Sequence, residues 1–143
     1  MVLTYAHTST IVFRIELGEK IPDSILNVVK KYGISSGIVI GIGGLKSVKL
    51  GIFKGEGYDV KEYKCENGAL ELVSLIGNIA LLNDEPSLHL HVTIGLPNGQ
   101  TVSGHLFEAE VYPTVEIFIL KLEGLEPLRR SYNPKVKLKL LQA

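Results

Sequence analysis

The chain has almost no cysteine, no excess charge of either sign and no long apolar run. Cys65 is the only cysteine among 143 residues, which excludes an intramolecular disulfide and a cysteine-based zinc cluster. Fifteen Lys plus Arg balance fifteen Asp plus Glu, whereas domains that grip duplex DNA usually carry a basic excess, because phosphate neutralisation supplies much of their affinity. No apolar stretch approaches the roughly twenty residues that span a bilayer, and no signal peptide opens the chain. We therefore expect a cytoplasmic protein with no membrane partner.

What is present is the composition of one globular domain. Hydrophobic residues make up 45% of the chain and charged residues 21%, which is typical of a folded protein. A chain of this length buries most of its apolar surface in a single core. No internal repeat or linker divides it, so residues 1–143 are expected to form one domain.

Apolar and polar residues alternate along most of the chain, which predicts strands. Strands are expected over residues 10–18, 58–64, 69–82, 88–94, 101–107 and 114–122, and residues 36–53 are expected to form two short strands around a glycine bend. Residues 21–33 instead have helical spacing, with Pro22 in the first turn and Gly33 at the C-terminal cap. The predicted fold class is α+β, a mostly antiparallel sheet with one or two flanking helices.

Three of the four histidines lie within residues 88–107, and the loop between two strands decides whether they meet. A two-residue turn at 98–99 would place Val92 opposite His105, which sets an apolar face against a polar one. A three-residue loop at 97–99, Pro-Asn-Gly, has proline and glycine where a type I turn with a left-handed third residue favours them. That loop places His91 opposite His105 and keeps apolar residues facing apolar ones. We therefore predict a cross-strand pair of histidines.

The third histidine, His89, falls on the same face as this pair. Residues directly opposite each other have Cβ atoms about 4.5–5.5 Å apart, and residues two apart on one strand are separated by roughly 7 Å. At these spacings His89, His91 and His105 can bind one ion, Zn or another divalent transition metal, at about 2.0–2.1 Å. Three histidines with a free fourth position are the layout of a catalytic zinc site. The alternative, solvated histidines or a hydrogen-bonded subunit contact, stays open.

Two further features concern charge. Glu116 lies on the polar face of the strand predicted over residues 114–120 and is the candidate catalytic residue for proton transfer. The alternative is that it is a charge that faces solvent. The basic run over residues 128–141 is interpreted as a solvated strand edge kept soluble by its lysines.

The glycines of residues 41–47, GIGGLKS, do not match a phosphate-binding loop and indicate a bend or bulge.

The order of these segments resembles the plants-and-prokaryotes conserved domain, PPC, formerly the domain of unknown function 296. The resemblance runs from about residue 10 to 122, and "HVTIGLPNGQTVSGHL" followed by "TVE" is its most specific part. Ala69 and Leu70 stand where plant members carry Arg and Phe. The resemblance implies an α+β fold assembled as a homotrimer. In plants the domain accompanies AT-hook DNA-binding motifs, but this sequence has no Arg-Gly-Arg-Pro hook, so DNA binding is not carried over.

A more distant likeness, at the level of the fold, is to acetolactate decarboxylase, whose zinc is held by an H-x-H pair and a later histidine. His89, His91 and His105 match that order. The first hypothesis is thus a homotrimeric assembly or regulatory module of the PPC type that binds a metal ion or small-molecule ligand at the three-histidine face. The alternatives are a zinc-dependent lyase or hydrolase that uses the same histidines with Glu116, and a DNA-associated regulatory protein.

Overall fold

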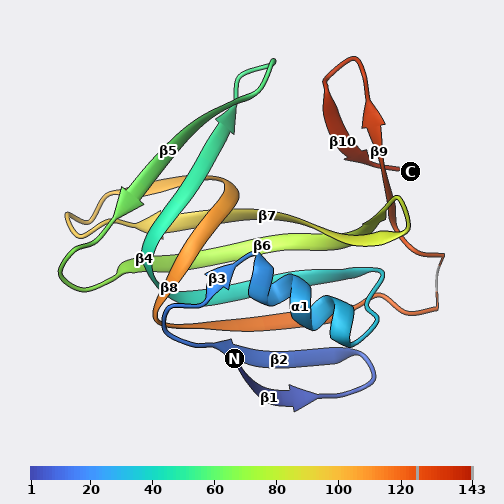
Figure 1. The fold of residues 1–143 in the computed structure, drawn as a ribbon, viewed down its shortest axis with the longest axis horizontal. Helices are drawn as coiled ribbons and strands as arrows, with labels where there is room; N and C mark the ends of the chain where they lie inside the picture. Colours follow the sequence, from blue (N-terminus) through green and yellow to red (C-terminus); the bar gives the residue numbers. More distant parts are fainter. Residues whose placement is uncertain (125, 143) are drawn as a thin grey trace.

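The computed structural model describes residues 1–124 and 126–142, apart from the side chain of Thr4. A single ten-stranded sheet runs through the molecule, with one helix packed on it (Figure 1). The elements are β1 (Val2–Ala6), β2 (Thr10–Ile15), β3 (Lys20–Ile21), α1 (Asp23–Lys31), β4 (Gly37–Phe53), β5 (Tyr58–Lys64), β6 (Leu70–Leu82), β7 (Glu85–Gly95), β8 (Thr101–Lys121), β9 (Arg129–Asn133) and β10 (Leu138–Leu141).

The sheet is antiparallel except where β9 pairs with β6. Its main path is β1-β2-β8-β4-β6-β9-β10, with β3 on β8, β5 on β4, and β7 between β6 and the first part of β8. The predicted antiparallel sheet is confirmed. The α+β class holds in its coarser sense, because the described chain is mostly strand and its helical content is one nine-residue helix.

Helix α1 forms where the helical spacing predicts it. Its buried apolar residues, Ile25, Val28 and Val29, lie three and four positions apart and face the core. Pro22 stands at the N-cap, and Gly33 follows the helix with a φ of +60°, the left-handed conformation that glycine adopts at no steric cost. Among the described residues no helix is long and apolar enough to cross a membrane.

Two strands are longer than the sequence predicts. Residues 37–53 form one strand, β4, instead of two short ones, and residues 101–121 form one strand, β8. The glycines of β4 bend it where it crosses β8: a Cβ at Gly43 would lie 2.3 Å from the Thr114 carbonyl oxygen. The pairing shifts register there instead of ending. As a result, the first part of β8 forms one strand of the predicted histidine hairpin, and its last part contributes side chains to the core.

The two faces of the sheet differ in what covers them. One face of β2, β4, β6 and β8 is fully buried, with side chains such as Phe13, Val39, Leu75 and Ile117. The opposite face is exposed, and part of it is apolar. We call this part the apolar sheet face, and it consists of Ile38 and Ile40 on β4, Ile76 on β6, and Phe118 and Leu120 on β8.

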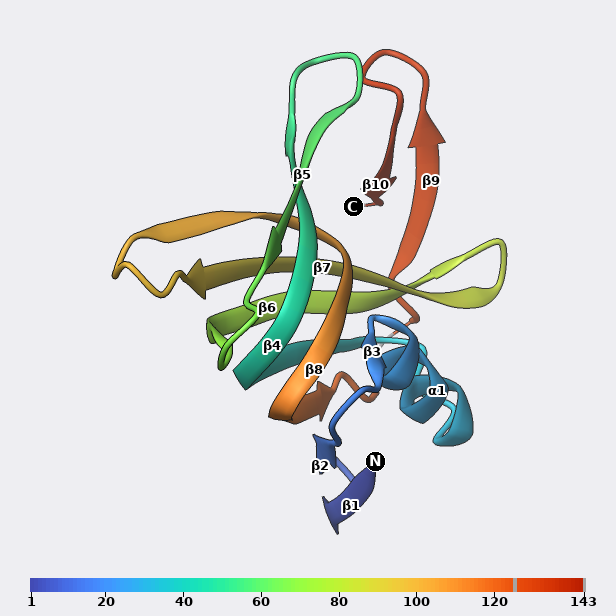
Figure 2. The ribbon, with the colours of Figure 1, turned by 60° about the vertical axis from the view of Figure 1, so that its left-hand side comes forward.

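Two hairpins rise from the sheet as arms, β4–β5 on one side and β9–β10 on the other (Figures 1 and 2). Their tips are joined by an ion pair, in which Lys137 Nζ lies 3.2 Å from Glu56 Oε1. The β9–β10 arm is the basic C-terminal run, which the sequence predicts to be a solvated strand edge. That prediction is wrong for Arg130, whose residue surface is only 8% exposed. The two arms flank a pocket that is also lined by residues of β6 and β7.

Candidate metal centre

The hairpin that joins β7 to β8 has the predicted three-residue loop. The Leu96 amide donates a hydrogen bond to the Gln100 carbonyl at 2.8 Å, and the Gly99 amide donates to the Leu96 carbonyl at 2.9 Å. Gly99 has a φ of +85°, which suits glycine at the third loop position. In this register His91 lies directly opposite His105. The predicted cross-strand pair is confirmed.

Strand β6 supports the histidines from the other side. Asn78 pairs with His89, and Ile76 pairs with His91, so these side chains share one face of the sheet. Between them is Gly77, where an added Cβ would lie 1.9 Å from the His89 carbonyl oxygen. The two backbones thus approach closely at His89, and only a residue without a side chain permits it.

His89, His91 and His105 form a compact cluster. Their ring centroids are 5.0 Å apart for His89 and His91, 5.2 Å for His89 and His105, and 5.7 Å for His91 and His105. One nitrogen from each ring lies within 4.8 Å of the other two. An ion bound at about 2.0–2.1 Å to each in tetrahedral geometry needs nitrogens about 3.4 Å apart. Small rotations of the side chains supply that difference.

The surroundings of His89 and His105 favour the neutral imidazole, which is the form that binds metal. Burial, followed by the charges of His89 and His91, lowers the pKa of His105 to about 4. Burial lowers the pKa of His89 as well, followed by the positive charges of Arg130 and His91. The buried Nδ1 of His105 has no hydrogen-bond partner among the described residues. A buried nitrogen left free to coordinate, in a cluster of this donor set, fits a divalent transition metal.

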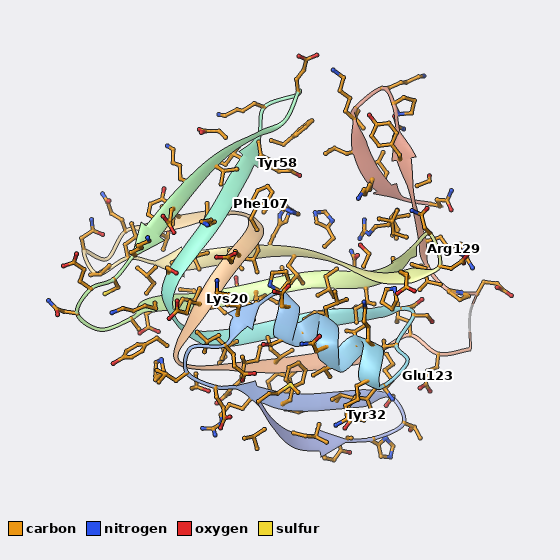
Figure 3. All side chains as sticks on the ribbon, viewed as in Figure 1. Lys20, Tyr32, Tyr58, Phe107, Glu123 and Arg129 are labelled. Carbon is orange, nitrogen blue, oxygen red and sulfur yellow. The ribbon has the colours of Figure 1, made fainter. Side chains whose placement is uncertain are left out.

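Aromatic side chains form a wall against His105. The Tyr58 ring on β5 has its centroid 5.1 Å from that of His105, and the Phe107 ring on β8 lies at 5.0 Å. The two aromatic rings also meet edge to face at 5.3 Å, and Figure 3 shows them together where the β4–β5 arm leaves the sheet. This wall accounts for the burial of His105. The sequence gives no local sign of this wall, because Tyr58 lies in a strand that pairs with β4 and not with the hairpin.

A pocket of about 580 Å³ opens beside the cluster, between the two arms. His89 and His105 reach it from the hairpin, and Arg130 reaches it from β9. The Arg130 guanidinium donates a hydrogen bond from Nη2 to the Asn78 side chain, and burial lowers its pKa. Sequence reasoning missed Arg130 as a site residue. In the sequence it is the second of two consecutive arginines in a basic run and precedes Ser131, so nothing local distinguishes it from the exposed Arg129.

The structure does not bring Glu116 to the histidines. Glu116 is exposed on the far half of β8, beyond the register shifts, and pairs with Arg14 on β2 and Ile42 on β4. The expected proximity is wrong within one chain, because residues 101–121 are a single long strand whose two halves pair with different neighbours. His7 is likewise remote, beside Tyr5 in the N-terminal segment.

The comparisons with known proteins agree with this description. The family model of the Plants and Prokaryotes Conserved (PCC) domain matches residues 4–123. A PPC protein from Pyrococcus horikoshii is 38% identical, with a TM-score of 0.85 over 99% of this chain and 95% of the other. A metal-containing protein from Archaeoglobus fulgidus is 29% identical, with a TM-score of 0.85 over 100% and 99%. A proposed DNA-binding protein from Bacteroides thetaiotaomicron is 26% identical, with a TM-score of 0.89 over 99% and 98%. No curated protein matches the sequence.

A more distant likeness is to acetolactate decarboxylase from Bacillus subtilis. It is 11% identical, with a TM-score of 0.56 over 78% of this chain and 51% of the enzyme. At this identity the comparison shows a shared fold, and the chain corresponds to about half of the enzyme. The likeness expected from the order of the histidines is thus confirmed for the fold.

Proposed function

The chain belongs to the Plants and Prokaryotes Conserved domain family, and from that premise we propose that it binds one divalent transition metal ion, zinc in the first instance, through His89, His91 and His105. The observation that carries the proposal is the cluster of three imidazole nitrogens within 4.8 Å of one another. The unpartnered, buried Nδ1 of His105 supports it. So does the description of the Archaeoglobus fulgidus protein as metal-containing.

The same residues support a second candidate function, a metal-dependent lyase or hydrolase. Three protein ligands leave a coordination position free, and a bound divalent ion there supplies Lewis-acid polarisation of a carbonyl or activation of a water. The observation that favours this candidate is the pocket of about 580 Å³ that reaches His89 and His105. In this chain His89 and His105 hold the ion at the pocket wall, and the rings of Tyr58 and Phe107 keep water from one side of His105.

We further propose that the chain assembles with copies of itself as a homotrimer, as the family resemblance implies. The apolar sheet face supports association, because large apolar patches on a monomer usually mark an interaction site. Ile76 on this face pairs directly with His91, so a covering copy would lie next to the metal centre. We do not extend the proposal to DNA, because the chain has no excess of basic residues.

The test of the metal site is the metal content of untagged protein, measured by plasma mass spectrometry. We expect about one zinc or other transition metal ion per chain in the natural sequence and its loss in His105→Ala. The matched control is His7→Ala, which removes a histidine outside the cluster and should keep the metal. A natural chain that binds no metal even after incubation with zinc would refute the proposal.

A further inference from the structure

Arg130 is a buried charge without a counter-charge. Its residue surface is 8% exposed, and it forms no ion pair with any carboxylate of the described residues. Nη2 donates to the Asn78 side chain, and Nη1 makes a long contact of 3.5 Å to the Lys139 carbonyl oxygen. Nε is buried with no partner among these residues. Because a buried, unpaired cation is costly, this arrangement indicates a site for an anion that the protein binds from outside.

The pocket that Arg130 faces has one buried cation, and much of the rest of its lining is apolar or aromatic. Lys137 and Lys139 of the β9–β10 arm also line it, but both are exposed. Leu88, Leu138 and Leu140 line it together with Tyr58 and Tyr132. Its described lining contains no Asp or Glu. A volume of about 580 Å³ falls within the range of about 300–1,000 Å³ for small-molecule sites. The ligand that fits is therefore small, with one anionic group and a carbon skeleton.

The anion site and the metal centre are neighbours. Asn78, which accepts the hydrogen bond from Arg130, is the cross-strand partner of His89. His89 and Arg130 also line the same pocket. A ligand of a few carbon atoms that pairs with Arg130 consequently extends along the side of the cluster formed by His89 and His105.

We propose that this pocket binds a small carboxylate, whose carboxyl group pairs with the guanidinium of Arg130 and whose other end lies at the three-histidine site. The contact with a metal ion rests on the function proposed above, whereas the contact with Arg130 does not. A carboxylate fits better than a phosphate, because phosphate sites gather several charged or backbone donors. Here Arg130 is the one buried cation of the described lining, whereas Lys137 is paired with Glu56 and Lys139 is exposed. The planar guanidinium matches the two oxygens of a carboxylate.

The test is calorimetric titration of zinc-treated and metal-free protein with butyrate, 2-oxobutyrate, 2-hydroxybutyrate and inorganic phosphate. Butyramide serves as the uncharged counterpart of butyrate. We expect at least one carboxylate to bind with a Kd below about 1 mM, with no binding of butyramide. Arg130→Met should weaken that binding by about tenfold or more while the zinc content stays unchanged. Arg129→Met is the matched control, since Arg129 is exposed and paired with Asp84, and it should bind like the natural chain.

Arg130→Lys keeps the charge but loses the planar fork, so it should bind more weakly than the natural chain. This variant decides the matter if Arg130→Met does not fold. Failure of every carboxylate to bind, equal binding by the Arg130 variants, or tighter binding of phosphate would each overturn the proposal. Carboxylate binding that depends on Arg130, in a chain that takes up no zinc on zinc treatment, would uphold the anion site and refute the metal function alone.

Discussion

At the scale of single residues, His105 is the histidine whose surroundings differ most from water. The rings of Tyr58 and Phe107 cover it, and His89 and His91 stand close enough to disfavour a second positive charge. The result is an imidazole whose pKa falls to about 4. The same features that prepare a nitrogen for metal also make the metal-free fold sensitive to acid.

The free energy of unfolding of the metal-free protein should therefore fall as the pH falls from 6.5 to 4. Well above pH 6.5 His105 is neutral in both states and contributes no pH dependence. At lower pH the unfolded chain binds a proton that the folded chain does not, so the unfolded state is stabilised relative to the folded one. This loss of folding stability is complete below about pH 4, where His105 is protonated in both states. We expect this histidine to contribute about 1–2 kcal/mol after allowance for solvent screening.

Urea unfolding in EDTA at several pH values measures this effect. The comparison is between the natural chain and His105→Phe, which keeps a ring in place but has no proton to bind. The difference in slope between the two plots of unfolding free energy against pH isolates the contribution of His105 from that of the carboxylates that also titrate in this range. Parallel pH profiles for the two proteins would contradict the prediction.

At Gly77 the backbone of β7 lies so close that no side chain fits. Gly77→Ala would set a methyl group 1.9 Å from the His89 carbonyl oxygen, so β6 and β7 must separate at the metal centre. We expect a loss of about 2–3 kcal/mol in the free energy of unfolding, as for an overpacked site, with reduced zinc content. The matched control is Gly95→Ala on β7, where the nearest atom is the Glu71 Cβ at 3.3 Å. Equal effects of the two substitutions would show that close approach at His89 is not the cause.

At the scale of the elements, the hairpin that joins β7 and β8 is specified locally, which is why the sequence predicts it. Strict alternation on both strands and one proline and glycine in the loop leave a single register in which apolar faces meet. The structure has that register, with His91 opposite His105. Helix α1 is predicted for the same reason, because its spacing and cap signals are contained within residues 21–33.

The loop itself gives an element-scale prediction. Gly99→Ala forces alanine into a φ of +85°, which should reduce the free energy of unfolding by about 1 kcal/mol. The register is also held by the alternating faces, so the zinc content should be unchanged. Urea unfolding and metal analysis of one preparation measure both quantities. Loss of zinc with normal stability would mean that the loop, and not the strand faces, sets the position of His105.

The parts that the sequence does not predict depend on pairings between distant segments. The glycines of residues 41–47 indicate the bend in β4, but nothing near residues 37–53 or 101–121 indicates that each range forms one continuous strand, because the bends are allowed by glycines that contact a different strand. Arg130 joins the site through a parallel pairing of β9 with β6. Glu116 is separated from the histidines because Glu116 and His105 lie in different halves of the long strand β8. Local periodicity carries no information about these long-range contacts.

At the scale of the whole molecule, the apolar sheet face is the feature that a single chain leaves unexplained. Its side chains are cross-strand neighbours, since Ile40 pairs with both Ile76 and Phe118, and Ile38 pairs with Leu120. Their exposed fractions range from 39% to 58%. A contiguous surface of this kind costs free energy in water, and its burial against other copies would stabilise an assembly.

Ile40→Glu should consequently dissociate the proposed trimer, because a carboxylate at the centre of the apolar sheet face would be buried there without a partner. We expect the natural chain to sediment at the mass of three 15.6 kDa copies and the variant at the mass of one. Leu17→Glu is the matched control: Leu17 is 62% exposed on a turn outside this face, and its replacement should leave the trimer intact. Since Ile40 pairs with Ile76, and Ile76 with His91, the zinc content of the monomeric variant also shows whether one chain suffices for the metal centre. A natural chain that sediments at 15.6 kDa would refute the assembly and leave the apolar sheet face to a different partner.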